Sequence, residues 1–297
     1  MNALELNDIS RYQEHGRPVL EAIDLTLEPG EVVGLLGENG AGKTTLIRIA
    51  LGMLQAQKGS VRLFGRDPRE SEVELRQRIG YVSEDQALPP YLRVRDALEL
   101  HAALYPTWDA QLARELLDQF GLEDKRRIGR LSKGQARRVA VVCAIAHRPE
   151  LLLLDEPAGG FDPAARREFL ETALRLLSEE GSAVLFSSHH LADVERLASR
   201  VVFLHGGRKF IDAPLDSLRE ASHLAVFASG NDLRRPDLLA LESCRAARVV
   251  GEELRGTFVA SEATVRGELA QLETHQEPHL RPVSLEDLFI ELVEGTR

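Results

Sequence analysis

Residues 37–44 read GENGAGKT, directly after the apolar run VVGLL at 32–36, and the helical pattern TTLIRIALGML starts at Thr44. The octapeptide fits G-x-x-x-x-G-K-[ST], the pattern of a phosphate-binding loop between a strand and a helix. Glycines let successive backbone N–H groups point at a phosphate, and the helix N-terminus adds partial positive charge. A glycine-rich turn that binds nothing is the alternative. The flanking strand and helix favour a phosphate-binding loop, or P-loop.

The P-loop predicts a bound nucleotide with β- and γ-phosphates, together with Mg²⁺. Lys43 would reach the β- and γ-phosphates, and the Thr44 hydroxyl would ligate Mg²⁺. The other positions of this segment expected to contact the nucleotide are Gly37, Asn39, Gly40, Ala41, Gly42 and Thr45.

A second run, LLLLDE at 151–156, supplies carboxylates. Its apolar residues predict a buried strand, whose end would deliver the acids into the crevice where α/β sheets bind ligands. Asp155 would hold Mg²⁺ through water, and Glu156 would act as general base on the attacking water. Apolar strands that end in acids are common, so this interpretation depends on the P-loop.

The order of elements predicts an α/β fold. AVLFSS at 183–188 and RVVFL at 200–204 are continuous apolar runs, typical of parallel strands buried on both faces. LELNDIS at 4–10 and VLEAIDLTLE at 19–28 alternate apolar and polar residues, which indicates half-buried antiparallel strands. A helix is expected from Pro163, with proline in its first turn.

Two changes of pattern divide the chain into regions. Between about 86 and 150 the pattern is helical, with RVRDALELHAALY, DAQLARELLDQFGL and GQARRVAVVCAIAH. From about 214 onward lysine is absent and short strand and helix patterns mix. We therefore expect an α/β domain at 1–213 that includes a helical subdomain at about 86–150, and a small α+β accessory domain at 214–297.

Composition excludes several classes of protein. The net charge of −10 over 297 residues argues against nucleic-acid binding through a basic surface. Cys143 and Cys244 lack metal-like spacing and are expected to be reduced thiols. No apolar run approaches the ~20 residues of a membrane helix, and the N-terminus has no signal-peptide pattern. We expect a soluble, cytosolic chain that reaches a membrane only through a partner.

The pentapeptide LSKGQ at 131–135 precedes a helical run far from the P-loop. Alone it could be a helix cap, because Ser is a preferred N-cap residue. Together, however, five ordered motifs resemble the nucleotide-binding subunit of ATP-binding-cassette transporters over residues 1 to about 213. They are GENGAGKT at 37, LSKGQ at 131, LLLLDEP at 151, FDP at 161 and SSHH at 187.

The resemblance implies an ATP-hydrolysing subunit that pairs head to tail with a second ATP-binding subunit, in a homodimer with two ATP molecules between the partners. Ser132, Gly134 and Gln135 would then contact the γ-phosphate held by the opposite P-loop, again through a helix N-terminus. An integral membrane permease would be the second partner. It would hold the subunit peripherally on the inner face of the cell membrane, and no nucleic acid is expected.

Other family positions transfer one at a time. Tyr12 matches the aromatic that stacks on adenine, although a lone tyrosine after a strand can be surface packing. His189 matches the switch histidine at the γ-phosphate, and His190 falls one place beyond that register. Asp162 matches the acid of the loop that crosses between subunits, and it could also cap the helix from Pro163.

This sequence departs from the usual pattern at three places. Glu84 stands where many members have a glutamine that ligates Mg²⁺ and senses the membrane partner, and a glutamate oxygen can also ligate Mg²⁺. Lys133 replaces the first glycine of the signature. Gly159, followed by Gly160, replaces a serine of the crossing loop, which puts communication between the two sites in doubt more than hydrolysis.

The tail predicts a small sheet and a closing helix. HLAVFAS, RAARVVGEE and GTFVAS suggest strands, and Ser284 with Asp287 resembles a cap pair. A docking helix is favoured over a ligand sensor, since one face would gather Leu285, Leu288, Phe289, Leu292 and Val293. The ending PxSLEDLF resembles that of ATPase subunits from bacterial drug, antibiotic and polysaccharide exporters.

We expect an ATPase subunit that dimerises on ATP and energises a separate permease, in the direction of export. The alternative is an ATP-dependent clamp on a ribosome or DNA, but such relatives usually carry two cassettes or a coiled-coil insertion. A nucleotide switch with little turnover is a third hypothesis, which intact Glu156 and His189 disfavour.

Overall fold

The computed structural model describes residues 1–14, 16–69, 73–84, 88–159, 161, 166–167, 170–172, 181–228, 233–272 and 278–295. The chain forms two compact units, Met1–Asp212 and Ala213–Arg297. All the candidate site residues that the structure describes belong to the first unit. Asp162 and Gly160 lie outside the described residues, as does most of the helix expected from Pro163.

A sheet of mainly parallel strands forms the centre of the first unit. Among the described residues it has six strands in the order β5-β6-β7-β3-β8-β9. Strands β3, β6 and β7 are buried throughout, as expected for a sheet covered on both faces. The four strands expected at 32, 151, 183 and 200 are confirmed. The bounds are β3 Val32–Leu36, β5 Ile79–Val82, β6 Leu151–Leu154, β7 Ala183–Ser188, β8 Arg200–His205 and β9 Arg208–Pro214.

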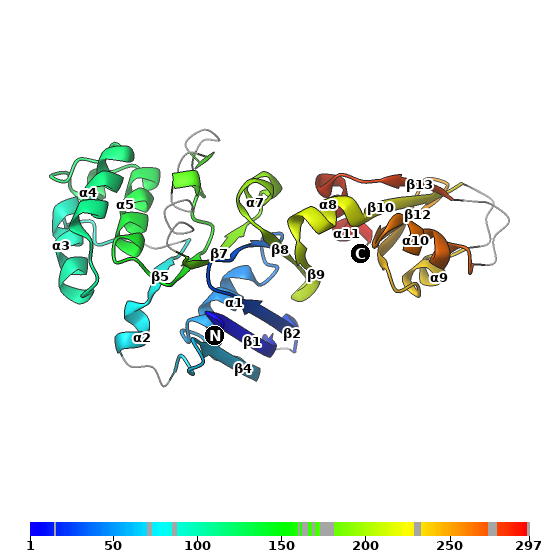
Figure 1. Ribbon diagram of the computed structural model, residues 1–297, viewed down its shortest axis with the longest axis horizontal. Helices are drawn as coiled ribbons and strands as arrows, with labels where there is room; N and C mark the ends of the chain where they lie inside the picture. Colours follow the sequence, from blue (N-terminus) through cyan, green and yellow to red (C-terminus); the bar gives the residue numbers. More distant parts are fainter. Residues whose placement is uncertain are drawn as a thin grey trace. The chain divides into compact units, whose positions relative to one another are not determined.

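A second sheet has the order β2-β1-β4 and is antiparallel. Its strands are β1 (Leu4–Tyr12), β2 (Pro18–Leu27) and β4 (Lys58–Leu63). The alternating pattern of β1 and β2 was predicted correctly. Their apolar residues pack in one core with residues of β3 and of the first helix. Figure 1 shows these three strands side by side, beside helix α1.

Helices surround this framework. The three expected between 86 and 150 are present as α3, α4 and α5, which form one group in Figure 1. Asp109 caps α4, since its Oδ1 accepts from the backbone N–H groups of Gln111 and Leu112, both at 2.9 Å. The bounds are α1 Lys43–Ala50, α2 Val73–Gln77, α3 Val94–Leu104, α4 Ala110–Gln119, the 3₁₀ turn η1 Ile128–Arg130, α5 Lys133–Ile145 and α7 Leu191–Leu197.

The second unit is an antiparallel sheet of order β11-β12-β10-β13 with helices. Its bounds are α8 Leu215–Ala221, β10 Ser222–Phe227, α9 Arg235–Leu239, β11 Cys244–Val250, β12 Glu253–Val259, α10 Glu262–Leu269, β13 His279–Pro282 and α11 Leu285–Gly295. Helix α11 is the expected closing helix, and Ser284 Oγ accepts from the Asp287 N–H at 3.1 Å. Arg248 of β11 holds α11 by donating two bonds of 2.6 Å to the buried Glu291 carboxylate.

Candidate functional site

The candidate site lies where three neighbouring strands end. In the order β6-β7-β3 these strands run parallel, so their carboxyl ends meet at one edge of the sheet. The P-loop follows β3, Asp155 and Glu156 follow β6, and Ser187 to His189 come from the end of β7. This edge is where open α/β sheets bind ligands. The fold therefore brings together residues that are more than 100 positions apart in the sequence.

The P-loop makes close contacts that only glycine allows. Gly42 caps α1 with a φ of 104°, and an added Cβ would lie 2.6 Å from Leu20 Cδ2. At Gly37, an added Cβ would lie 2.4 Å from the carbonyl oxygen of Leu204 at the end of β8. The loop is thus pressed between β2 and β8. Its exposed part consists of Glu38, Asn39 and Gly40.

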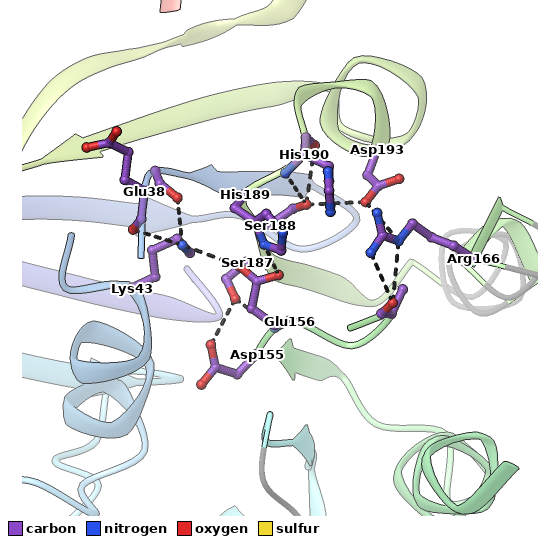
Figure 2. Close-up of polar contacts among 12 residues, drawn as sticks. Glu38, Lys43, Asp155, Glu156, Arg166, Ser187, Ser188, His189, His190 and Asp193 are labelled. Atoms are coloured by element: carbon purple, nitrogen blue, oxygen red, sulfur yellow. Dashed lines mark hydrogen bonds and ion pairs between the residues drawn. The ribbon is translucent and has the colours of Figure 1, made fainter. Parts of the chain in front are cut away.

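Lys43 folds back over the loop that it closes. The side chain is 6% exposed, and Nζ donates to the carbonyl oxygens of Gly37 at 2.6 Å and Glu38 at 3.2 Å. Nζ also lies 3.3 Å from Oε1 of Glu156 (Figure 2). This distance gives an ion pair, but the Oε1 atom has no hydrogen bond within the described residues, so the two groups are close without being aligned. A single ammonium group therefore joins the loop to the end of β6.

Asp155 connects all three strand ends. Its side chain is fully buried, and Oδ1 accepts from the hydroxyls of Thr44 at 3.1 Å and Ser187 at 2.9 Å. Such bonds to a charged group are worth about 1.5–3 kcal/mol each. The second oxygen, Oδ2, is buried and has no hydrogen-bond partner within the described residues. A buried carboxylate oxygen without a donor favours a bound cation or its water.

Glu156 has an unusual backbone conformation. Its φ of 46° is left-handed, which for a non-glycine residue costs on the order of 1–3 kcal/mol and is found most often at functional sites. The Glu156 N–H donates to Ser187 Oγ at 2.8 Å. An ionised carboxylate can only accept, so His189 Nδ1 donates to Oε2 at 2.9 Å. The expected general base and switch histidine are therefore in direct contact (Figure 2).

The neighbouring His190 belongs to a different group of contacts. Its ring centroid lies 3.9 Å from that of His189, but its backbone N–H donates to Ser188 Oγ at 2.9 Å. Ser188 in turn donates to Asp193, which lies 3.9 Å from Arg166. Burial, with the charge of Arg166 second, holds the pKa of His190 below its ordinary value. The structure thus brings His189, and not His190, against Glu156.

The LSKGQ segment forms the start of α5 and is a helix cap. Ser132 Oγ accepts from the Gln135 N–H at 3.2 Å, and Gln135 Oε1 accepts from the Ser132 N–H at 3.1 Å. This reciprocal capping box is worth about 1 kcal/mol. Ser132 and Lys133 are exposed, and Gly134 is half-buried. The cap is compatible with a second role, since it orders the backbone N–H groups at an accessible helix N-terminus.

Three further candidate residues lie apart from this contact network. Tyr12 is half-buried at the end of β1 and is paired with Pro18 of β2. The next residues of β2, Val19 and Leu20, lie against Gly42. Thr45 is half-buried in the first turn of α1. Glu84 has an exposed side chain, and its recorded contact is through its carbonyl, which accepts from Arg137. The structure does not join the Glu84 carboxylate to Thr44 and Asp155.

Two residues of this region received no role in the sequence analysis. Ser187 bonds to both Asp155 and Glu156, and its position at the end of an apolar strand was the available signal. Arg137 of α5 donates from Nη1 to the Glu156 carbonyl at 2.6 Å. No sequence pattern indicated that contact, because it depends on how closely α5 approaches the sheet.

Comparison with known proteins gives the family. Residues 20–159 match the family described as ABC transporter. The chain is 34% identical to the ABC transporter ATP-binding protein NatA of Bacillus subtilis, over 73% of this chain and 92% of that protein. It is 32% identical to the Nod factor export ATP-binding protein I of Paraburkholderia xenovorans, over 98% of this chain and 96% of that protein.

A solved structure described as the ATP-binding subunit of an ABC transporter superposes with a TM-score of 0.66 and 32% identity. It covers 73% of this chain and 92% of the other. The chain belongs to the ATP-binding subunits of ABC transporters and is an ATPase.

Proposed function

We propose that this ATPase dimerises head to tail on ATP and energises a separate membrane permease, in the direction of export. The observation that carries this proposal is the connected set at the strand ends, in which Thr44, Asp155, Glu156 and His189 are linked through Lys43 and Ser187. ATP bound between two faces would favour the closed dimer, hydrolysis would release it, and the difference would move the permease.

Glu156 is the proposed general base. Its carboxylate would accept a proton from the water that attacks the γ-phosphate, while the Nδ1–H of His189 fixes the direction of the Oε2 oxygen. Lys43 would leave the Gly37 and Glu38 carbonyls to contact the β- and γ-phosphates. The 3.3 Å distance between Lys43 Nζ and Glu156 Oε1 supports this assignment, because it places the proposed phosphate-binding cation next to the proposed base.

Mg²⁺ is the proposed metal, and Thr44 and Asp155 are the residues that would hold it. The hydroxyl and the carboxylate already meet at 3.1 Å, and Asp155 offers a second buried oxygen with no donor in the described chain. Hard oxygen ligands of this kind suit Mg²⁺. When bound, the ion neutralises charge on the phosphates. We propose Glu84 as an additional ligand. Its side chain is exposed and would have to turn toward Thr44 and Asp155 to reach the ion.

A second subunit would complete each site. The N-terminus of α5, with Ser132, Gly134 and Gln135, offers an end that can bind an anion. Among the described residues, this end has no hydrogen bond or ion pair with the P-loop of its own chain. Such an end could cap the γ-phosphate held by the partner's P-loop. Tyr12 would stack on adenine and Asp162 would cross between subunits. A homodimer is the simplest assembly.

The permease is the proposed partner on the membrane side. In the described part of the chain, no helix is long and apolar enough to cross a bilayer. The name of the Nod factor export relative, matched over nearly its full length, supports export. A clamp on a ribosome or DNA is disfavoured by the net charge of −10. We propose residues 1–213 as the ATPase domain, with the helical subdomain at about 86–150, and 214–297 as an accessory domain.

A test of the permease assignment is a search of the neighbouring genes for a membrane protein of about six helices, followed by coexpression of that protein with this chain. The ATPase is expected to sediment with the membranes and to return to the supernatant when that membrane protein is omitted. Sedimentation with ribosomes, or retention on DNA, with no dependence on the membrane protein would contradict the proposal and support the clamp.

Replacement of the proposed base tests the chemistry. Glu156→Gln keeps the size of the side chain but cannot accept the proton, so turnover should fall by ~10²-fold or more while ATP still binds. ATPase rate and ATP affinity should be measured on the same preparation. Wild-type turnover in this variant would rule out Glu156 as general base.

Ser132→Arg tests the composite site. The substitution leaves Tyr12 and the P-loop of the same chain untouched, so monomers should bind ATP normally but fail to dimerise on it. Calorimetry at low protein concentration and sedimentation velocity measure the two properties separately. Loss of ATP affinity by the Ser132→Arg monomer would mean that the segment serves its own chain.

A mixing experiment sharpens this test. Ser132→Arg and Lys43→Ala subunits should each be inactive alone. In a head-to-tail heterodimer both lesions fall in one site and the other site is intact, so mixing should restore part of the hydrolysis. Mixtures that stay inactive, while heterodimers are detected by mass, would argue against shared sites.

A further inference from the structure

Arg137 joins two loops that come from neighbouring strands. It lies in the second turn of α5 and is half-buried. Its Nη1 donates to the Glu156 carbonyl oxygen at 2.6 Å, and its Nη2 donates to the Glu84 carbonyl oxygen. Glu84 follows β5 by two residues and Glu156 follows β6 by two residues, and these strands are paired in parallel. One guanidinium therefore holds both strand ends to the helix that begins with LSKGQ.

The bond to Glu156 acts on a backbone that needs support. With a φ of 46°, Glu156 is in a conformation that a non-glycine residue rarely adopts. Its N–H is fixed by Ser187 Oγ at 2.8 Å, and its carbonyl accepts from Arg137 and from the Gly159 N–H at 3.0 Å. A charged donor makes the stronger bond to a carbonyl oxygen. Without Arg137, the Gly159 N–H would be the one remaining donor to the Glu156 carbonyl among the hydrogen bonds of the described residues.

The direction of this peptide decides where the carboxylate points. Glu156 Oε2 meets His189 Nδ1 at 2.9 Å and Oε1 lies 3.3 Å from Lys43 Nζ. A relaxation of φ toward ordinary values would rotate the side chain away from both groups. Because Arg137 sits on α5, a displacement of that helix would change the carbonyl contact and, through it, the carboxylate.

We propose that Arg137 is a positioning residue for hydrolysis, which holds Glu156 in its left-handed conformation and makes that conformation depend on the position of α5. The inference rests on the proposed role of Glu156 as general base. It adds a path within one chain, from the helix that carries Ser132 to the base, through the Glu156 carbonyl oxygen. The same cation reaches Glu84, so the segment after β5 shares this path.

Arg137→Gln is the main test. Loss of the cation should lower kcat by about 10-fold to 100-fold, the range expected when a catalytic group is misplaced, while the ATP dissociation constant stays within about twofold. Arg137→Lys keeps the charge but has one nitrogen in place of the two Nη atoms that reach the two carbonyls, so its kcat should be intermediate. An unchanged kcat in Arg137→Gln would overturn the proposal.

Arg114→Gln is the matched control. Arg114 also donates to a carbonyl, that of Ala110 at 3.1 Å, but the bond stays within α4 and reaches no strand end. Its kcat should equal that of the wild type. A kcat loss in Arg114→Gln equal to that of Arg137→Gln would assign both effects to general loosening of the helices and overturn the proposal.

The decisive readout is the combination with Glu156→Gln, measured under single-turnover conditions. If Arg137 acts through Glu156, adding Arg137→Gln to Glu156→Gln should change the residual rate little, although Arg137→Gln alone is strongly impaired. Multiplication of the two losses would show an independent role and overturn the proposal. ATP binding and circular dichroism of each variant confirm folding, and Arg137→Lys serves if Arg137→Gln does not fold.

These outcomes separate this inference from the proposed function. If Glu156→Gln is inactive and Arg137→Gln is fully active, Arg137 has no positioning role and the base assignment stands. If Glu156→Gln turns over normally, the base assignment fails, and the positioning of Glu156 by Arg137 fails with it.

Discussion

The buried Asp155 carboxylate is the interaction on which the site depends. Its Oδ1 atom accepts from Thr44, which follows β3, and from Ser187, which ends β7, while Asp155 itself follows β6. A fully buried carboxylate is stable only when it is paired or hydrogen-bonded, so the three strand ends must stay in register. Ser187 Oγ also accepts from the Glu156 N–H, and the Glu156 carboxylate in turn contacts Lys43 and His189. The positions of the residues proposed for metal and water are thus set by one anion.

Much of the fold could be predicted from local patterns. The motif GENGAGKT correctly predicted a strand, a loop and a helix in that order. The structure explains two of its glycines, because a Cβ at Gly37 or Gly42 would meet backbone or core atoms. Runs such as LLLLD could be assigned to the parallel sheet because they are apolar on both faces. Strands β4, β5 and β9 were missed, because KGSVRL, IGYV and RKFIDAP form neither a continuous apolar run nor a full alternation of apolar and polar residues. The contacts of Ser187 and Arg137 could not be predicted, because they depend on strand order, on the φ of Glu156 and on the approach of α5.

Helix α5 carries both the LSKGQ segment and Arg137. Its N-terminus carries the capped LSKGQ segment, and one turn later Arg137 reaches the carbonyls of Glu84 and Glu156. If the N-terminus binds the partner's nucleotide, the same helix would report that event to its own base. Lys133 and Gly159, where this sequence departs from the usual family pattern, lie next to these contacts. Neither departure removes a hydrogen bond described above, and the Gly159 N–H itself donates to the Glu156 carbonyl. Coupling between the subunits would then rest on backbone contacts more than on the serine that Gly159 replaces.

The most direct test of the central claim is amide hydrogen exchange with and without ATP, at protein concentrations below and above dimerisation, using Glu156→Gln to prevent turnover. ATP should slow exchange in the P-loop, residues 37–44, at both concentrations, because a monomer binds its own nucleotide. Slower exchange at residues 132–135 is expected only at the high concentration, where a partner supplies the phosphate. Equal protection of residues 132–135 in the monomer, or no protection in the dimer, would contradict the head-to-tail composite site.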